Sequence, residues 1–423
     1  MDHLNLFNSY EKKPLYHEDQ LTRAFLILTK SIKLVEGIFL EIVIDQMKKN
    51  NIEQIPSNIF SSSSGAELIE TQVWSTSKEK LENESGRLVS IIITDERLLE
   101  KHKVNRTERT GVYDGFIKFK PDWIFIIENK PNHKNIWIEQ LSSKFNENYE
   151  IEEKPIILTW KEIIKRLSLL LENGLLTNTE SILVEDFLEY VSEYFYELNP
   201  YDKFSLCNDN KYLLDKHCVE IMKNSKIGDV NYHRGWKNYI DITNKPGVKM
   251  VTLFSSQLKS DENWFINFEI YPGDAMSQAR YFYKTLDIEK IRALLNYGWE
   301  ITPNFHFAFR SSNLVWTKTK MDIINYLTYW KNLVAKNLLV QQKRENWKDY
   351  FEELTNINII SQDDFDRISE KIINTKMSTI NICPGVCFNY RWEKDNVIKI
   401  EEKSKNSFNE EFSKIYNQVM AVW

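Results

Sequence analysis

Two short apolar segments lie close together in the chain and carry charged residues: Tyr113-Asp114-Gly115-Phe116-Ile117 and Trp123-Ile124-Phe125-Ile126-Ile127-Glu128-Asn129-Lys130. Both are rich in the aromatic and β-branched residues that favour strands. Thirteen residues separate Asp114 from Glu128, which is enough for one strand to run out, turn at Lys120-Pro121-Asp122 and return. We therefore expect an antiparallel pair that brings both carboxylates to one edge of a sheet.

The residue types at this edge are those that hydrolysis of a phosphodiester requires. Strand periodicity sends Glu128 and Lys130 to one face and Asn129 to the other. Mg²⁺ prefers one or two protein carboxylates together with water and phosphate oxygens, which suits a site made from Asp114 and Glu128. Because water must attack a substrate that is already an anion, Lys130 would orient that water or neutralise the developing charge. We therefore predict a metal-dependent phosphodiesterase site.

The same segments have a simpler interpretation, which spacing alone favours. An antiparallel pair at a protein surface can end in solvated Asp and Glu-x-Lys residues, and a single Glu-x-Lys is common by chance. A second register is excluded, because only five residues lie between Asp122 of the literal Pro-Asp and Glu128. That is too short for a strand, a turn and a second strand. We interpret Asp122 as a turn residue.

A helix is expected upstream of these segments. Residues 17–28 have helical spacing, and one stripe of this helix is apolar: Leu21, Ala24, Phe25 and Leu28. Glu18 extends this stripe. A carboxylate aimed at a core needs a partner, and a cation is one, although the helix macrodipole also favours a carboxylate at this position.

Two further segments complete the order of elements. Residues 67–74 alternate like a strand, with Glu70 and Gln72 on one face. Residues 136–145 have the spacing of a short amphipathic helix, with Gln140 and Lys144 on one side. Such a pair can hold a phosphate or a strand end, whereas a surface helix offers the same pattern without any function.

The order helix with Glu, strand, strand with Asp-Gly, strand with Glu-x-Lys, helix with Gln resembles the PD-(D/E)XK nuclease superfamily over residues 1–160. The glutamine on the last helix is similar to that of the RecB-type and defence-associated branches. The resemblance implies a restriction-endonuclease-like core, a mixed sheet flanked by helices with Mg²⁺ where two central strands diverge. The sequence departs from the pattern at Tyr113, where the superfamily often has Pro, and at Lys144, where the RecB-type branch has Tyr.

By this resemblance, Asp114 and Glu128 would be metal ligands, and Glu18 would be the helix acid that joins them. Lys130 would be the catalytic lysine and Gln140 the motif glutamine of the active site. The cofactor would be Mg²⁺, with Mn²⁺ as the alternative cation. The chain would be an endonuclease or exonuclease that binds and cuts DNA in bacterial anti-phage defence or restriction. It would act as a homodimer, since cutting two strands calls for two sites.

A second hypothesis keeps the nuclease fold but removes the chemistry. In it, the protein is a catalytically silent binding or regulatory protein whose C-terminal domain recognises a nucleic acid, a ligand or a partner protein. The presence of Asp114, Glu128 and Lys130 together argues against it, because a scaffold needs none of the three in register. A third hypothesis is an enzyme held silent until a partner or an activating ligand binds the C-terminal domain.

Composition limits the wider interpretation. With 423 residues, of which 42% are hydrophobic, the chain can bury more than one core. A net charge of −6 argues against a protein that coats nucleic acid with its whole surface, so a nuclease with this charge must concentrate its cations locally. The sequence offers five lysines around the candidate site for this: Lys118, Lys120, Lys130, Lys134 and Lys144. The four cysteines do not indicate a disulfide framework, and Cys383 with Cys387 lacks a second ligand pair for zinc.

The pattern of expected helices and strands changes twice along the chain, which predicts a mixed α/β fold in three parts. Residues 1–160 form the expected nuclease-like domain, residues 161–226 a helical bridge, and residues 227–423 a C-terminal α+β domain for sensing or specificity. In the last part, Tyr271-Pro272-Gly273-Asp274 predicts a turn with Asp274 or Ser277 as the N-cap of a helix. No basic segment followed by an apolar run opens the sequence, and no stretch approaches the length of a membrane span. We expect a cytoplasmic protein without membrane association.

Overall fold

The computed structural model of the 423-residue chain describes residues 6–7, 18–52, 65–74, 86–95, 103–105, 107–108, 110–119, 122–130, 141–142, 148–257, 263–309, 314–404 and 406–423. The fold is of the mixed α/β class, as expected, and the chain divides into two compact units. Unit 1 comprises Met1–Asp202 and Leu206–Leu213, and unit 2 comprises Lys203–Ser205 and Leu214–Trp423.

Unit 1 contains a mixed sheet and several helices. Its strands are β1 (Ala66–Trp74), β2 (Gly86–Ile93), β3 (Val112–Phe119), β4 (Trp123–Asn129), β5 (Tyr149–Ile151) and β6 (Ile156–Leu158). Its helices are α1 (Glu18–Ser31), α2 (Lys33–Lys49), α4 (Trp160–Glu172), α5 (Asn178–Tyr194) and the short η3 (Tyr196–Leu198). The elements η4 (Phe204–Leu206) and α6 (Lys211–Asn224) contain residues of both units.

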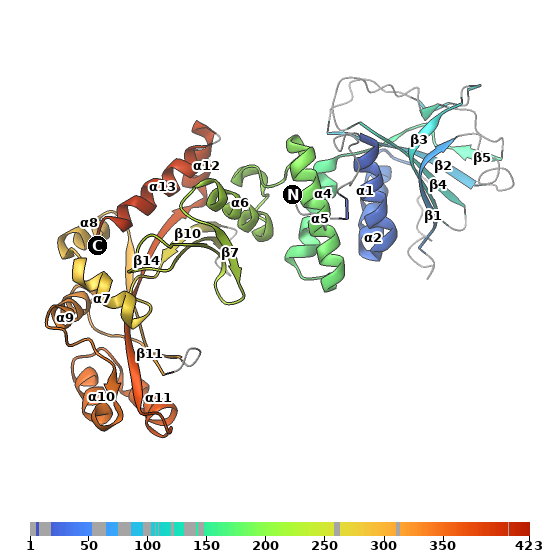
Figure 1. Ribbon diagram of the computed structural model, residues 1–423. Helices are drawn as coiled ribbons and strands as arrows, with labels where there is room; N and C mark the ends of the chain where they lie inside the picture. Colours follow the sequence, from blue (N-terminus) through green and yellow to red (C-terminus); the bar gives the residue numbers. More distant parts are fainter. Residues whose placement is uncertain are drawn as a thin grey trace. The chain divides into compact units, whose positions relative to one another are not determined.

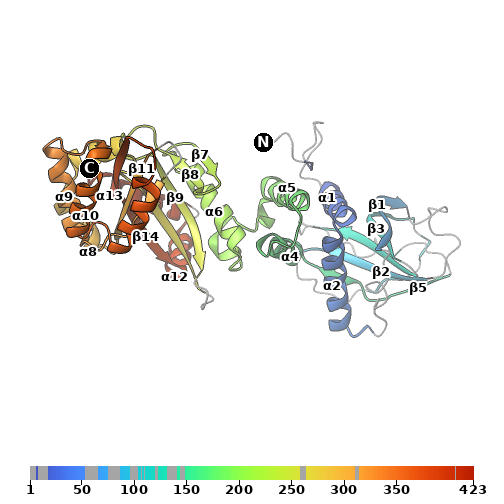
Figure 2. The ribbon, with the colours of Figure 1, turned by 90° about the horizontal axis from the view of Figure 1, so that it is seen from below.

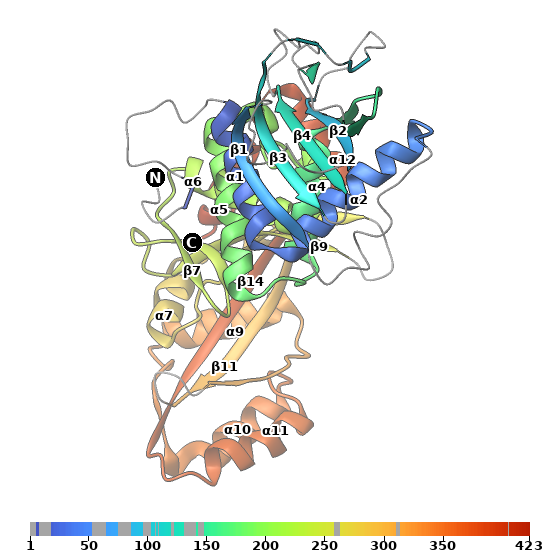
Figure 3. The same cartoon turned by 90° about the vertical axis from the view of Figure 1, so that its right-hand side faces the viewer.

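The strands of unit 1 follow the order β1-β3-β4-β2-β5, and β6 also pairs with β2. Figure 3 shows β1, β3, β4 and β2 side by side in this order. β3 is antiparallel to β1 and to β4, whereas β2 is parallel to β4, β5 and β6. The expected antiparallel pairing of the two segments that carry Asp114 and Glu128 is confirmed, with Ile117 opposite Phe125. Asp122 lies in the turn before β4, as expected.

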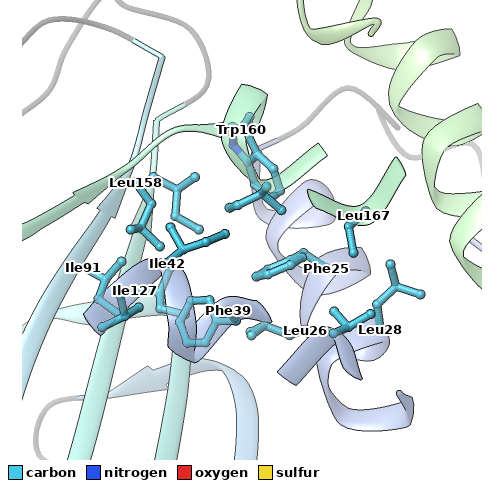
Figure 4. Packing of buried hydrophobic residues seen from close by; sticks show 14 of the residues in the cluster. Phe25, Leu26, Leu28, Phe39, Ile42, Ile91, Ile127, Leu158, Trp160 and Leu167 are labelled. Carbon is cyan, nitrogen blue, oxygen red and sulfur yellow. The ribbon is translucent and has the colours of Figure 1, made fainter. Parts of the chain in front are cut away.

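Helices α1, α2, α4 and α5 lie on one side of this sheet (Figures 1 and 2). The expected apolar stripe of α1 is confirmed, because Leu21, Ala24, Phe25 and Leu28 are all buried. Phe25 packs edge-on against Trp160 of α4 and Phe39 of α2, at the centre of the core in Figure 4. Since the apolar faces of α4 and α5 belong to this same core, the compact unit extends to residue 202, whereas the sequence predicts a boundary at 160.

The other face of the sheet is also covered. Phe116, Ile124 and Ile126 form a second buried cluster there, together with Leu88 and Tyr149. Every residue of β4 is buried, and in β2 only the first is not. Strands that are buried on both faces have near-continuous apolar sequences, as these two do.

Gly115 in β3 allows α1 to approach the sheet closely. A Cβ atom at this position would lie 2.9 Å from Leu26 Cδ1 and 3.1 Å from Ile127 Cβ. Contacts this short require the neighbouring atoms to move. The glycine that follows Asp114 is therefore explained by packing between a helix and the strand that carries the candidate site.

Unit 2 is built on a second sheet, which is antiparallel throughout its described strands. The strands follow the order β12-β11-β14-β10-β9-β8-β7, and β13 also pairs with β14. Their bounds are β7 (Val230–His233), β8 (Lys237–Asp241), β9 (Met250–Gln257), β10 (Trp264–Ile270), β11 (Glu300–Ala308), β12 (Leu314–Trp316), β13 (Gln342–Lys343) and β14 (Thr379–Glu393). The helices are α7 (Met276–Thr285), α8 (Ile288–Asn296), α9 (Ile323–Ala335), η5 (Arg344–Asn346), α10 (Trp347–Asn356), α11 (Gln362–Ile368), η6 (Ser369–Ile373), α12 (Lys394–Lys403) and α13 (Ser407–Met420).

The predicted N-cap of α7 is wrong. The capping position is occupied by Ala275, whose backbone N–H donates to Gln278 Oε1 at 3.1 Å. Asp274 instead accepts a hydrogen bond from Asn304 Nδ2 of β11 at 3.1 Å. The Asp274 carboxylate therefore binds a residue that is distant in the sequence, and it does not cap the helix as local spacing predicts.

No helix in the described part of the chain is both long enough and apolar enough to cross a membrane.

Candidate active site

Strands β3 and β4 bring the candidate residues together. Gly115 pairs with Ile127, so Asp114 and Glu128 follow as the next residues toward the same end of the strand pair. Both are buried, with 8% and 7% of their surfaces exposed. The Lys130 ammonium lies 3.0 Å from Glu128 Oε1, and the lysine side chain is itself only 15% exposed. The structure thus brings Asp114, Glu128 and Lys130 into one site.

Hydrogen bonds hold the Asp114 carboxylate in place. The backbone N–H of Asn129 donates to Asp114 Oδ2 at 2.9 Å, and Gln72 Nε2 donates to Oδ1 at the longer distance of 3.4 Å. Gln72 lies in β1 between residues that pair with the neighbours of Asp114. Its backbone is left-handed, with φ 55°, a conformation that costs a non-glycine residue about 1–2 kcal/mol. Both neighbouring strands therefore contribute to the position of one carboxylate.

Asn129 connects the site to the core. Its side chain lies on the opposite face from Glu128, as strand periodicity predicts, and its Oδ1 accepts a hydrogen bond from Trp160 Nε1 at 2.8 Å. Trp160 is completely buried among the helices of unit 1. The residue that donates its backbone N–H to Asp114 is thus anchored to the main core of the unit.

The electrostatics of the site are dominated by burial and by like charges. Burial and the neighbouring Glu128 carboxylate raise the pKa of Asp114 to about 7. The Asn129 N–H and the Lys130 ammonium act in the opposite direction, and the Asp19 carboxylate of α1 raises the pKa further. Two further carboxylates, Glu128 and Asp19, therefore act on Asp114, an arrangement in which a cation is favoured.

The donor set fits a hard divalent cation. Mg²⁺ needs only one or two protein carboxylates, which Asp114 and Glu128 supply, and it keeps water and substrate oxygens as its other ligands. Over the residues that the structure describes, no group of three His, Cys, Asp or Glu side chains is arranged to hold a metal ion. The pair of Asp114 and Glu128 therefore differs from the closed cage of four protein ligands that is typical of structural zinc sites.

Two expected site residues cannot be placed. Glu18 begins α1, but its side chain lies outside the described residues. Gln140 lies outside them as well, as do Lys120, Lys134 and Lys144 of the expected lysine cluster. Lys118 is described and forms an ion pair with Glu67 Oε2 of β1 at 3.3 Å.

Sequence reasoning missed Asp19. This residue follows Glu18 directly, and its carboxylate acts on Asp114. A signal was present in the spacing: Thr22 and Leu26 lie three and seven residues further on, and both are buried. The stripe through Asp19, Thr22 and Leu26 adjoins the buried apolar stripe of α1 and also faces the protein interior. No local signal links Asn129 to Trp160, because thirty residues lie between them.

Comparisons with protein-family models, with curated proteins and with solved structures found no match for this chain.

Proposed function

We propose that unit 1 is a metal-dependent nuclease that hydrolyses phosphodiester bonds, with DNA as its substrate. One observation carries the proposal. Two buried carboxylates from adjoining strands, Asp114 and Glu128, meet at one end of a sheet with Lys130 3.0 Å from Glu128. A protein without chemistry at this place would gain nothing from burying two acids side by side, because their mutual repulsion opposes folding.

Each residue has a distinct part in the proposed reaction. Asp114 and Glu128 would hold Mg²⁺ or Mn²⁺, which when bound supplies Lewis-acid stabilisation of the charge on the phosphate. Lys130 is positioned beside Glu128 to orient the attacking water and to neutralise developing negative charge. The backbone N–H of Asn129 holds Asp114 in its orientation, and Trp160 holds Asn129. Asp19 adds negative charge on the side of α1.

The biological setting follows from the resemblance of the motif. Defence-associated PD-(D/E)XK nucleases carry the same order of acids and lysine, which favours a cytoplasmic enzyme of bacterial anti-phage defence or restriction. A homodimer would place two copies of the site on the two strands of a duplex. Unit 2 would then select the substrate or respond to an activating ligand or partner.

The direct test is cleavage of plasmid and of linear DNA by the purified protein in Mg²⁺. We expect Asp114→Asn, Glu128→Gln and Lys130→Met each to lower the rate by at least about 100-fold, because each removes charge stabilisation at the reacting phosphate. The matched control is Asp122→Asn, which removes a carboxylate from the turn between the same two strands and should cleave at the wild-type rate.

Calorimetry separates the proposal from a catalytically silent scaffold. Binding heat with Mg²⁺ or Mn²⁺ that disappears in Glu128→Gln and remains in Asp122→Asn is the expected result. Cleavage that survives the substitutions of Asp114, Glu128 and Lys130, or metal binding that ignores Glu128, would overturn this assignment of the site.

A further inference from the structure

A hairpin of unit 2 gathers aromatic and basic side chains on an exposed surface. Strands β7 and β8 pair through the register Tyr232 opposite Asn238 and His233 opposite Lys237, and the connecting residues are Arg234, Gly235 and Trp236. β7 is the edge strand at one end of the sheet of unit 2. It is labelled in Figure 1. Every residue from 231 to 237 is exposed. We call the side chains of Tyr232, His233, Arg234, Trp236 and Lys237 the hairpin surface.

The charge of the hairpin surface is opposite to that of the chain. The whole protein has a net charge of −6, yet no acidic residue lies between Val230 and Ile240. Arg234 and Lys237 supply two positive charges within four residues. Within the described residues, neither of these two side chains forms an ion pair. Their charge is therefore available to an anion from solution.

Two large aromatic side chains accompany these cations. Tyr232 is 66% exposed and Trp236 is 38% exposed. Burying an aromatic side chain stabilises a fold, so keeping two of them at the surface of one hairpin loses that gain. Single exposed apolar residues are ordinary, but exposed aromatic residues clustered with unpaired cations are typical of a binding surface.

Neighbouring groups fix the orientation of the Trp236 indole. The His233 ring lies with its centroid 4.4 Å away, and the Tyr239 ring packs edge-on at 5.9 Å. The Lys249 ammonium lies 5.4 Å from the indole centroid, within the range of a cation–π interaction. The Gly235 N–H donates to His233 Nδ1 at 3.1 Å, which shapes the turn. The indole is thus held in place before any ligand binds, which lowers the entropic cost of binding.

Lys237 occupies a backbone conformation that disfavours lysine. Its φ is 62°, in the left-handed region that glycine and asparagine adopt most readily. Glycine at this position would relieve the backbone and remove the charge at the same time. This makes Lys237→Gly a test of the charge that does not weaken the fold.

We propose that the hairpin surface binds single-stranded nucleic acid, with bases stacked on Tyr232 and Trp236 and phosphates held by Arg234 and Lys237. Alternating aromatic and basic side chains match a strand in which every nucleotide offers a flat base and a negative phosphate. A duplex buries the faces of its bases, so it can use only the cations. The choice of nucleic acid over an acidic protein rests on the proposed nuclease function of unit 1.

The experiment measures binding without cleavage. Full-length protein in EDTA is titrated into fluorescently labelled single-stranded DNA and single-stranded RNA of one sequence, and into the matching DNA duplex, with anisotropy as the readout. We expect Tyr232→Leu and Trp236→Leu each to weaken single-strand binding roughly 5- to 100-fold, the range for loss of one base stack. Lys237→Gly and Arg234→Gln should each reduce the slope of log affinity against log salt by about 0.7. The DNA and RNA arms identify which strand chemistry is preferred.

Matched controls come from other exposed positions in unit 2. Tyr297, at the end of α8, is 72% exposed, and the Lys348 side chain is 78% exposed. Tyr297→Leu and Lys348→Gln should bind like the wild type. Thermal unfolding of every variant distinguishes a binding defect from misfolding, and Lys237→Gly is expected to melt no lower than the wild type.

Several outcomes would overturn the proposal. These are the absence of oligonucleotide binding by the wild type, equal affinity for the duplex, or affinity that falls in Arg234→Gln but not in either aromatic variant. Competition by poly-L-glutamate as effective as that by unlabelled oligonucleotide would assign the surface to an acidic protein instead. Binding is measured without metal, so it is independent of the proposed nuclease function. Hairpin-dependent binding without any cleavage in Mg²⁺ would contradict the nuclease proposal and support the binding proposal.

Discussion

Some of the groups around Asp114 favour its protonated form, and others favour its ionised form. Burial and the Glu128 carboxylate favour the protonated form, and their effect exceeds that of the Asn129 N–H and Lys130, which favour the ionised form. A divalent cation between the two carboxylates would reverse this balance. Asp114 therefore destabilises the metal-free fold at neutral pH, and its surroundings favour the binding of a cation. A residue under this conflict is typical of a functional site, where activity and stability are often opposed.

Replacing Asp114 with Asn should reveal this conflict in metal-free protein. The pKa rises from the ordinary 3.8 to about 7 on folding, so the folded state binds the proton more tightly than the unfolded state does. The stabilising contribution is complete below about pH 4 and is lost as the pH rises to about 7, by roughly 1–4 kcal/mol. Urea unfolding in EDTA should show that the free energy of unfolding of the wild type falls relative to that of Asp114→Asn as the pH rises from 4.5 to 8. A difference in the free energy of unfolding between the wild type and Asp114→Asn that is independent of pH would contradict this.

The site was predictable to the extent that its residues are neighbours in sequence. Asp114, Glu128 and Lys130 lie on two strands joined by a short turn, so alternation and spacing were enough to bring them together. Asp19 approaches Asp114 from another element, and its position depends on how α1 crosses the sheet. Gln72 required a backbone conformation that no propensity predicts, since φ near 55° is rare for glutamine in a strand.

At the scale of secondary-structure elements, the site depends on the close approach of α1 to β3 at Gly115. Strand pairing between β3 and β4 follows from local sequence, but the insertion of β2 between β4 and β5 does not. That order depends on parallel pairing between segments far apart in the chain, which local patterns do not specify. The failed prediction for Asp274 has the same origin, because Asn304 of a distant strand binds its carboxylate.

Two glycine-to-alanine substitutions should have opposite effects in unit 1. In Gly115→Ala the new methyl group would meet Leu26 and Ile127 at 2.9 and 3.1 Å, so we expect a loss of about 1–3 kcal/mol in the free energy of unfolding. In Gly37→Ala, within α2, the new methyl group would have no atom within 4 Å apart from its chain neighbours and the backbone of its own helix. Alanine is the better helix former, so a gain of about 0.5–1 kcal/mol is expected.

Denaturant unfolding of both variants measures the two effects under one set of conditions. Leu26 is a core residue, so Leu26→Ala is destabilising by itself. In a double-mutant cycle, Gly115→Ala should cost less in the Leu26→Ala background than in the wild type, because the smaller side chain makes room for the methyl group. Equal stability of Gly115→Ala and the wild type would mean that α1 does not press on the sheet at this position.

At the scale of the whole molecule, the chain behaves as two units with separate sheets and separate cores. Composition indicates that more than one core can form, but not where the division falls. Helices α4 and α5 resemble a bridge in the sequence because they follow the last strand of unit 1. Their apolar faces nevertheless belong to the same core as α1 and α2, which only three-dimensional packing decides.

Scanning calorimetry should resolve two unfolding transitions, of which Mg²⁺ raises only one. A ligand that binds one folded unit stabilises it by about 2.7 kcal/mol at a concentration 100 times its dissociation constant, which shifts the midpoint by several degrees. Glu128→Gln should abolish the shift, and Glu67→Gln should preserve it. Phe351→Leu, in the core of unit 2, should lower only the other transition. One cooperative transition that moves as a whole with Mg²⁺ would show that the units do not unfold independently.

Strand β14 has a consequence for the order in which the protein is made. It is the longest strand described, it lies between β10 and β11, and it comprises Thr379–Glu393. A ribosome therefore completes β10 and β11 long before the strand that joins them emerges. During that interval both strands present open edges, which are templates for pairing with other nascent chains. We expect correct folding of unit 2 in cells to depend on keeping those edges covered until synthesis has passed β14.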